Sequence, residues 1–234
     1  TRTGPFTPEP DTSKPAVPTA ALYGPVYPPG AFGRPAQPVQ PARLFVRGAT
    51  LWTCGPEGIL SKGDLLVERG KIVNVGSNLT APADAVVVDG SGMHVTPGLI
   101  DCHSHTAATG GVNEGSQSIT AEVRIGDVID PDDISIYREL AGGLTVANVL
   151  HGSANAIGGQ NQVIKLRWGS LPEEMKFEGA MPGIKFALGE NPKQSNWGDR
   201  YNSRYPQTRQ GVEEIIRDEF RAALDYDRVW KEFE

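Results

Sequence analysis

The feature that most constrains this chain is an apolar run, residues 97–100, that leads directly into the sequence DCHSH at residues 101–105. Side chains alternate between the two faces of a β-strand, so Asp101, His103 and His105 are expected to share one face. Two imidazoles spaced in this way at the end of a strand can converge on one metal ion, and imidazole is a common zinc ligand. The sequence therefore predicts His103 and His105 as metal ligands and Asp101 as a nearby catalytic or ring-orienting carboxylate.

Two histidines near a strand end can also be ordinary polar residues. Their position after an apolar strand, on one face with Asp101, favours the metal site. Cys102 is expected on the opposite face, which predicts a packed thiol rather than a nucleophile. The chain has two cysteines, too few for a disulfide framework, and their spacing is not that of a zinc knuckle.

Upstream of this motif the sequence predicts two segments. Residues 1–42 are dense in proline, which lacks the amide donor that helices and sheets need, so we expect an extended arm. Residues 43–96 carry short alternating runs, among them 64–68 and 71–75 on either side of an Arg-Gly turn. Such closely spaced short strands are typical of a small β-sandwich or barrel.

Downstream of residue 97 the pattern alternates between strands and helices. Asp130-Pro131 is expected to begin a helix, with Asp130 as N-cap and Pro131 at the first helical position. Apolar strands are expected at residues 144–150 and 183–188, and a helix at 211–234. This order predicts a parallel α/β unit.

Several motifs together resemble the amidohydrolase superfamily. They are the strand VTPGLIDCHSH, the hairpin VERGKIVNVG, and the runs GLTVANVLHGSANAIGGQ and GIKFALGENPK, of which the last two resemble an imidazolonepropionase-like subgroup. The resemblance covers about residues 43–234. It implies an α/β fold: the N-terminal part of a (β/α)8 TIM-like barrel at 97–234, and part of a composite β-sandwich at 43–96. It also implies one or two divalent ions, with Zn²⁺ the expected metal.

The same resemblance leaves two candidates for a further ligand. Glu190 follows the strand at residues 183–188, a placement similar to that of the N-acetylglucosamine-6-phosphate deacetylase branch, and is the preferred candidate. The alternative is Lys185, which would be carbamylated and bridge two metals, as in hydantoinase-like and phosphotriesterase-like branches. The two residues are five positions apart, so both cannot easily bind the same metal.

Two further residues are candidates for contact with substrate. His151 follows the strand at 144–150 and lies in a loop rich in Gly, Ser and Asn. A local hydrogen bond in that loop is the favoured alternative for its role. Gln160 follows two glycines, which allow close approach of the main chain to a substrate or to another loop.

The ligand set that the resemblance implies is incomplete in this sequence. The chain has four histidines, and none follows His151. About 137 residues follow Pro97 in the 234-residue chain, against roughly 250 in a typical eight-stranded barrel. We therefore predict that a C-terminal half, as a separate chain or segment, completes the site, and that the protein is a homo- or hetero-oligomer.

The completed protein is expected to hydrolyse an amide or other C–N bond of a small or peptide-like substrate. A deaminase, isomerase or lyase of the same superfamily, and an inactive scaffold subunit, are the alternatives.

The net charge of −6 and the absence of a Lys/Arg-rich run argue against nucleic-acid binding. No apolar stretch approaches the roughly 20 residues of a membrane span. The proline-rich arm, the first residue Thr and the resemblance to exported amidohydrolases favour a periplasmic or secreted protein.

Overall fold

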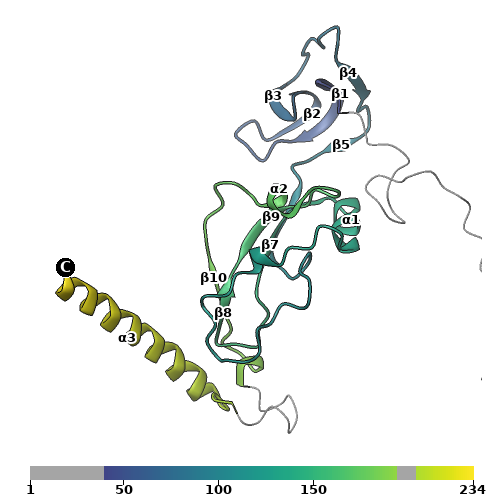
Figure 1. Ribbon diagram of the computed structural model, residues 1–234. Helices are drawn as coiled ribbons and strands as arrows, with labels where there is room; N and C mark the ends of the chain where they lie inside the picture. Colours follow the sequence, from purple (N-terminus) through teal and green to yellow (C-terminus); the bar gives the residue numbers. More distant parts are fainter. Residues whose placement is uncertain (1–39, 194–203) are drawn as a thin grey trace, which may run out of the picture. The chain divides into compact units, whose positions relative to one another are not determined.

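The computed structural model describes residues 40–193 and 204–234, so most of the proline-rich arm lies outside the described residues. Five strands near the beginning form one sheet (Figure 1). They are β1 (Arg43–Trp52), β2 (Ile59–Glu68), β3 (Lys71–Gly76), β4 (Val86–Asp89) and β5 (His94–Val95). The order is β3-β2-β1-β4, with β5 also on β1; β2 runs antiparallel to β1 and β3, whereas β4 and β5 run parallel to β1.

The predicted hairpin is confirmed as β2 and β3. Arg69 and Gly70 connect the strands with φ values of 48° and 75°. A tight hairpin turn with two positive φ values matches the right-handed twist of the flanking strands. Phe45 is fully buried in this sheet, but Ile72 and Val86 are more than half exposed. A second layer, as a sandwich requires, is not among the described residues, so the sandwich stays a prediction.

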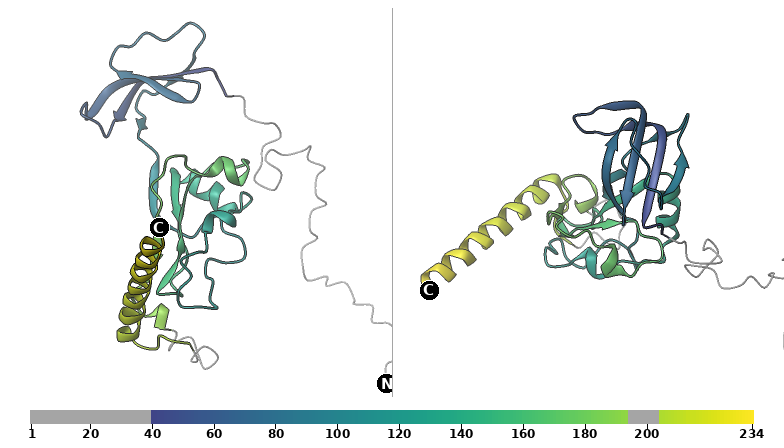
Figure 2. Two further views of the ribbon diagram at one scale, coloured as in Figure 1. Left: turned by 60° about the vertical axis from the view of Figure 1, so that its left-hand side comes forward. Right: turned by 90° about the horizontal axis from the view of Figure 1, so that it is seen from above.

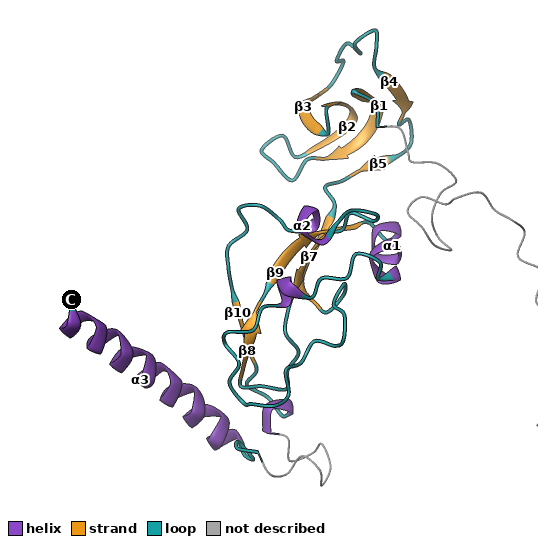
Figure 3. Ribbon diagram, viewed as in Figure 1, coloured by secondary structure: helices purple, strands orange, loops and turns teal. Residues whose placement is uncertain are grey.

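Residues 99–193 form a second group of elements that carries the candidate site (Figure 3). Its strands are β6 (Leu99–Ser104), β7 (Leu144–Val149), β8 (Ile157–Gln160), β9 (Gln162–Lys165) and β10 (Ile184–Phe186). Its helices are the 3-10 helices η1 (Ile125–Asp127) and η2 (Asn191–Lys193) and the α-helices α1 (Ile134–Ala141) and α2 (Pro172–Met175). One sheet has the order β6-β7-β9, and β8 pairs with β10 in another.

The expectation of a uniformly parallel unit is only partly met. β6 and β7 are parallel, with α1 between them in sequence, but β9 is antiparallel to β7 and β10 is antiparallel to β8. A parallel pair needs a crossover of a dozen or more residues, usually a helix. The chain between β7 and β9 is a loop with the short strand β8 and contains no helix. The connection therefore returns the chain in the opposite direction.

A hydrophobic core lies between the β6-β7-β9 sheet and the two short α-helices. Val149 of β7, Ile164 of β9, Ile136 of α1 and Met175 of α2 are all fully buried in it. Because α1 covers one face of the sheet, polar side chains that serve a site must come from the other face. This core thus decides which residues of β6 and β7 can reach a ligand.

The helix predicted to start at Pro131 begins three residues later, at Ile134. Its N-cap is Asp133, whose side chain accepts the main-chain N–H of Ser135 at 2.9 Å. Asp130 instead accepts the N–H of Asp132 in a turn before the helix. The Asp-Pro pair was the wrong choice because a second acidic residue downstream offers the same capping chemistry. The predicted stop is confirmed: Gly142 is the C-cap, and Gly143 has a φ of 91°.

The last element is the 25-residue helix α3 (Arg209–Phe233), which Figure 2 shows as one continuous helix. Thr208 caps it by accepting the N–H of Gly211 at 3.1 Å. Successive ion pairs at i,i+3 and i,i+4 spacing line its exposed surface, for example Arg217 with Glu213 and Lys231 with Asp227.

A helix with the length and apolar character of a membrane span does not occur in the part of the chain that the structure describes.

Candidate metal centre

The histidine motif lies on a β-bulge at the end of β6. Asp101 pairs with Ala147 and Ser104 pairs with Val149, so three steps along β6 match two steps along β7. The extra residue interrupts the alternation of side chains between the two faces. Asp101 and Ser104 therefore both stand opposite residues that are buried under helix α1.

This bulge corrects the predicted position of Asp101. Strict alternation would put Asp101 on the face of His103 and His105, but the register places it on the α1 side of the sheet. Its Oδ1 accepts the main-chain N–H of His103 at 3.0 Å. On the same side, burial raises the pKa of the Glu139 carboxyl, and the negative charges of Asp133 and Asp101 add to this effect. Asp101 thus holds the bulged main chain.

The thiol of Cys102 is exposed rather than packed, so that prediction is wrong within the described residues. The same bulge accounts for the difference, because residues inside a bulge leave the regular pleat.

The rings of His103, inside the bulge, and His105, just after it, lie close together. Their centroids are 5.3 Å apart, and the ring planes meet at 86°. Nδ1 of His105 donates a hydrogen bond to the carbonyl of Leu150 at 2.9 Å. A proton on Nδ1 leaves the lone pair on Nε2, which is the arrangement that metal-binding histidines usually have. The hydrogen bond to Leu150 therefore fixes the orientation of the His105 ring.

Lys185 joins this pair from strand β10. Its Nζ lies 3.1 Å from Nε2 of His103, and the residue is only 9% exposed. Burial lowers the pKa of Lys185. The positive charge of Lys185, followed by burial and by His105, lowers the pKa of His103. Both shifts favour the unprotonated forms, and a nitrogen must lose its proton before it can bind a metal.

Glu190, the preferred third ligand, lies elsewhere. Its carboxylate pairs with Arg209 at 2.8 Å and with Lys193. Hydrogen bonds from Lys193 and Arg209 lower its pKa. Strand β10 ends at Phe186, and Glu190 stands in the bend before η2, where it meets the first turn of α3. The residue that the structure brings to His103 is Lys185.

The site is partial within the described residues. No group of three His, Cys, Asp or Glu side chains there lies close enough to hold one metal ion. The group consists of two imidazoles and one buried lysine, whose pKa is lowered by burial. These three side chains fit the beginning of a metal centre, because each can offer nitrogen, or a modified lysine oxygen, as a donor.

His151 is fully engaged by main chain and is only 3% exposed. Nδ1 donates to the carbonyl of Gly152 at 2.9 Å, and Nε2 accepts the N–H of Glu114 at 2.8 Å. Burial lowers the pKa of His151. Its ring supports the loop that follows Leu150, whose carbonyl orients His105. These contacts correspond to the alternative of a locally hydrogen-bonded histidine.

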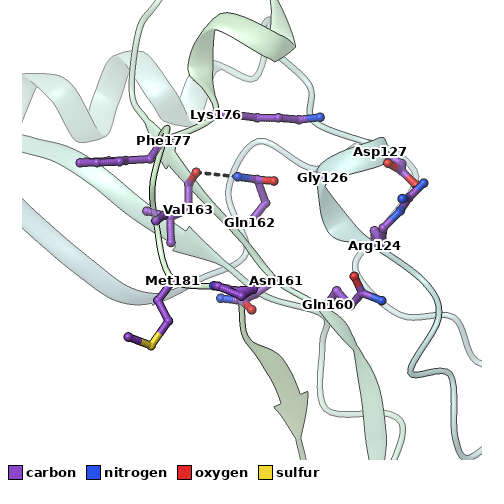
Figure 4. A pocket seen from close by; sticks show the side chains of 12 residues that line it. Arg124, Gly126, Asp127, Gln160, Asn161, Gln162, Val163, Lys176, Phe177 and Met181 are labelled. Atoms are coloured by element: carbon purple, nitrogen blue, oxygen red, sulfur yellow. Dashed lines mark hydrogen bonds and ion pairs between the residues drawn. The ribbon is translucent and has the colours of Figure 1, made fainter.

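Gln160 is exposed and donates to the carbonyl of Ala121 at 3.2 Å. It lines a pocket of ≈ 300 Å³ that also includes Arg124, Asp127 and Lys176 (Figure 4). His103, His105 and Lys185 do not line this pocket. The structure thus separates Gln160 from the histidine pair.

Sequence reasoning missed two asparagines near the site. Asn148 lies in β7, and Asn161 stands between β8 and β9; their side chains are hydrogen-bonded to each other. The available signal was a polar residue inside the otherwise apolar run at residues 144–150. A polar side chain in such a strand needs a partner, because burying it without one is costly.

Comparison with known proteins gives partial but consistent matches. No family model matches the chain. An amidohydrolase of Hapsidospora irregularis, tasK, is 31% identical over 236 residues, covering 81% of this chain and 24% of that protein. An imidazolonepropionase of Idiomarina loihiensis is 38% identical over 77 residues, or 32% of this chain and 19% of that protein.

Among solved structures, an amidohydrolase from Thermotoga maritima matches with a TM-score of 0.71 and 36% identity. The match covers 80% of this chain and 49% of the Thermotoga chain. The chain therefore spans about half the length of this structural relative and about a quarter of the fungal one.

Proposed function

The chain belongs to the amidohydrolase superfamily, and from this premise we propose that it is part of a metal-dependent hydrolase of an amide or other C–N bond. One observation carries the proposal: a buried lysine and two histidines, from strands far apart in sequence, meet at one point. Superfamily members of this kind use divalent metals, and Zn²⁺ is the proposed ion. One or two ions are proposed.

His103 and His105 are the proposed first ligands. The hydrogen bond from Nδ1 of His105 to Leu150 supports this role, because it directs Nε2 to the ligand side. Lys185 is the proposed third protein ligand, carbamylated or neutral, since Glu190 is already paired with two cations. A divalent ion in this position supplies Lewis acidity that polarises a carbonyl and makes water nucleophilic near neutral pH.

Asp101 is proposed to act through the main chain rather than on the reacting atoms. Its carboxylate accepts the N–H of His103 and so keeps the bulge in place. His151 supports the carbonyl that orients His105, and Gln160 is not assigned to the substrate. The general base of the reaction is proposed to come from outside the described residues.

We further propose that a C-terminal half, as a separate chain or a further segment, supplies the remaining ligands. The partial match to the Thermotoga chain supports this, as does the exposure of Leu99 and Ile100 at 61% and 70%. Parallel strands of this kind are normally buried on both faces. We also propose that the protein is a homo- or hetero-oligomer with a periplasmic or secreted location.

Deamination is the second candidate reaction. A 5-methylthioadenosine/S-adenosylhomocysteine deaminase of Desulforamulus reducens is 42% identical over 71 residues, which is 29% of this chain and 16% of that enzyme. Release of ammonia from an aminopurine, compared with release of a free amine or acid from dipeptides and cyclic amides, distinguishes the two reactions.

The test measures bound zinc and hydrolysis of these substrates by the complete protein and by His103→Ala and His105→Ala. Both variants are expected to lose stoichiometric zinc and most activity. His94→Ala is the matched control, because His94 lies in the other sheet and accepts the indole N–H of Trp52 at 2.9 Å. Zinc content and activity that are unchanged in both site variants would reject the proposal. A complete protein that neither binds zinc nor hydrolyses these substrates would favour an inactive scaffold.

A further inference from the structure

The residues that meet at the candidate metal centre come from two different sheets. His103 belongs to β6, in the β6-β7-β9 sheet, whereas Lys185 belongs to β10, which pairs with β8. In the described part of the chain, no ladder joins β10 to β6 or β7. We propose that Asn148 and Asn161 are positioning residues that set the separation of His103 and Lys185. The side chain of Asn148 binds the main chain beside His103, and Asn161 binds Asn148 through its side chain and Gly183 through its main-chain N–H. This inference rests on the function proposed above.

The first link starts at the bulge of β6. The bulge interrupts regular pairing with β7 between Asp101 and Ser104, so a main-chain carbonyl in this stretch needs another partner. The amide Nδ2 of Asn148 donates to the carbonyl of Cys102 at 3.3 Å. Cys102 is adjacent to His103, so this bond fixes the main chain from which the His103 ring projects.

The second link runs through Asn161, the one residue between β8 and β9 (Figure 4). Its Nδ2 donates to Oδ1 of Asn148. Its own main-chain N–H donates to the carbonyl of Gly183 at 3.1 Å. Gly183 precedes Lys185 by two residues, so Asn161 contacts the strand of Lys185 and the amide that holds the strand of His103.

Gly183 shows how closely β10 approaches this amide. A Cβ at position 183 would lie 2.6 Å from Oδ1 of Asn161, well inside van der Waals contact. Glycine is therefore needed for the strand of Lys185 to reach Asn161 without a shift. The close contact therefore depends on both Gly183 and Asn161.

The result is a continuous set of contacts from the Cys102 carbonyl, through the side-chain amides of Asn148 and Asn161 and then the main-chain N–H of Asn161, to the Gly183 carbonyl. These contacts form a second connection between the two segments, besides the direct contact of Lys185 with His103. Groups that orient metal ligands typically change metal affinity 10–100-fold when they are removed. Asn148 and Asn161 should act in this way, without touching the metal.

The experiment measures Zn²⁺ affinity of the complete protein by competition with a chromogenic chelator. The variants are Asn148→Ala, Asn161→Ala, the double variant, and Asn161→Asp, which keeps the side-chain shape but cannot donate to Asn148. Each single variant is expected to bind zinc about 10–100-fold more weakly. The double variant should add little to Asn148→Ala, because that single substitution already removes both side-chain hydrogen bonds.

Gln162→Ala is the matched control. Gln162 is the next residue after Asn161, and its Nε2 donates to the carbonyl of Val163 at 2.9 Å, away from both ligand strands. Its zinc affinity should stay within about twofold of the parent, on the ordinary small effect of substitutions away from a site. Equal losses in Gln162→Ala and Asn161→Ala would overturn the inference.

Crystal structures of the parent and of Asn161→Asp give a readout that does not depend on zinc. The separation of Lys185 Nζ and His103 Nε2 is expected to increase beyond hydrogen-bond distance in the variant. An unchanged separation overturns the inference, whatever the zinc affinity. A parent protein that binds no zinc would instead contradict the proposed function, while the separation still decides the role of the two asparagines.

Discussion

Nζ of Lys185 lies 3.1 Å from Nε2 of His103, although 82 residues separate them in sequence. Burial is the cause of the lowered pKa of Lys185, and among the described residues no carboxylate offsets it. A buried lysine without a counter-ion is unfavourable for folding, because a charged group loses its hydration. Such an arrangement is expected where the neutral or modified amine has a function.

The substitution Lys185→Met is therefore expected to increase the stability of the protein and to abolish its metal binding. Removing the buried amine should raise the free energy of unfolding of the metal-free protein by about 0.5–2 kcal/mol, in the range of typical stabilising substitutions. The same variant should lose bound zinc. Urea denaturation and metal analysis of the purified complete protein measure the two effects.

Lys165→Met is the control for Lys185→Met. Nζ of Lys165 lies 4.5 Å from the ring centroid of Phe177, and this contact should contribute about 0.5–1 kcal/mol. The control is expected to be slightly less stable and to keep its zinc. A destabilised Lys185→Met protein with full zinc content would contradict the role given to Lys185.

Much of this arrangement could be predicted from sequence, because its signals are local. The histidine motif after an apolar strand, the Arg69-Gly70 turn and the Gly142-Gly143 helix stop depend on residues within a few positions of each other. The position of Asp101 depends on a bulge, and a one-residue insertion in a ladder leaves no signal in the alternation of a single sequence.

The separation of Glu190 from the histidine pair has a different cause. Lys185 lies within the apolar run at residues 183–188 and Glu190 follows it, and only tertiary contacts tell them apart. Arg209 and Lys193 pair with the glutamate, whereas His103 faces the lysine. The antiparallel turn of β9 and the amide pair of Asn148 and Asn161 are likewise long-range features. Periodicity within one segment cannot report which strand lies beside it.

Added zinc is expected to stabilise the complete protein only when the histidine pair is intact. A ligand that binds the folded state alone adds about 2.7 kcal/mol at a free concentration 100 times its Kd. The melting temperature of the parent should rise with zinc and fall back with a chelator, whereas that of His103→Ala should stay constant. Equal shifts in both proteins would place the zinc elsewhere.

The cap of helix α1 should be a sensitive point for stability. One oxygen of Asp133 accepts the N–H of Ser135 at 2.9 Å, and the other accepts the N–H of Ala107 at 2.8 Å. Asp133→Ala should lower the free energy of unfolding by about 1–2 kcal/mol, the upper range for an N-cap. Asp130→Ala, at the position first expected to cap the helix, should have the smaller effect in the same urea titration; the reverse order would contradict the assigned cap.

Stability should also fall with pH below about 6.5 through His151, taking the ordinary histidine pKa for the unfolded chain. Burial lowers the folded pKa of His151, so the unfolded state binds the proton first as pH decreases. This contribution is fully present above the unfolded pKa and is lost as pH falls towards the folded one, by at most about 1.4 kcal/mol per pH unit. His151→Gln should flatten that part of the profile in chelator-treated protein, and His94→Gln should not. If the free energy of unfolding of the parent and of His151→Gln changed with pH in the same way over roughly pH 7 to 5, the buried imidazole would not govern acid stability.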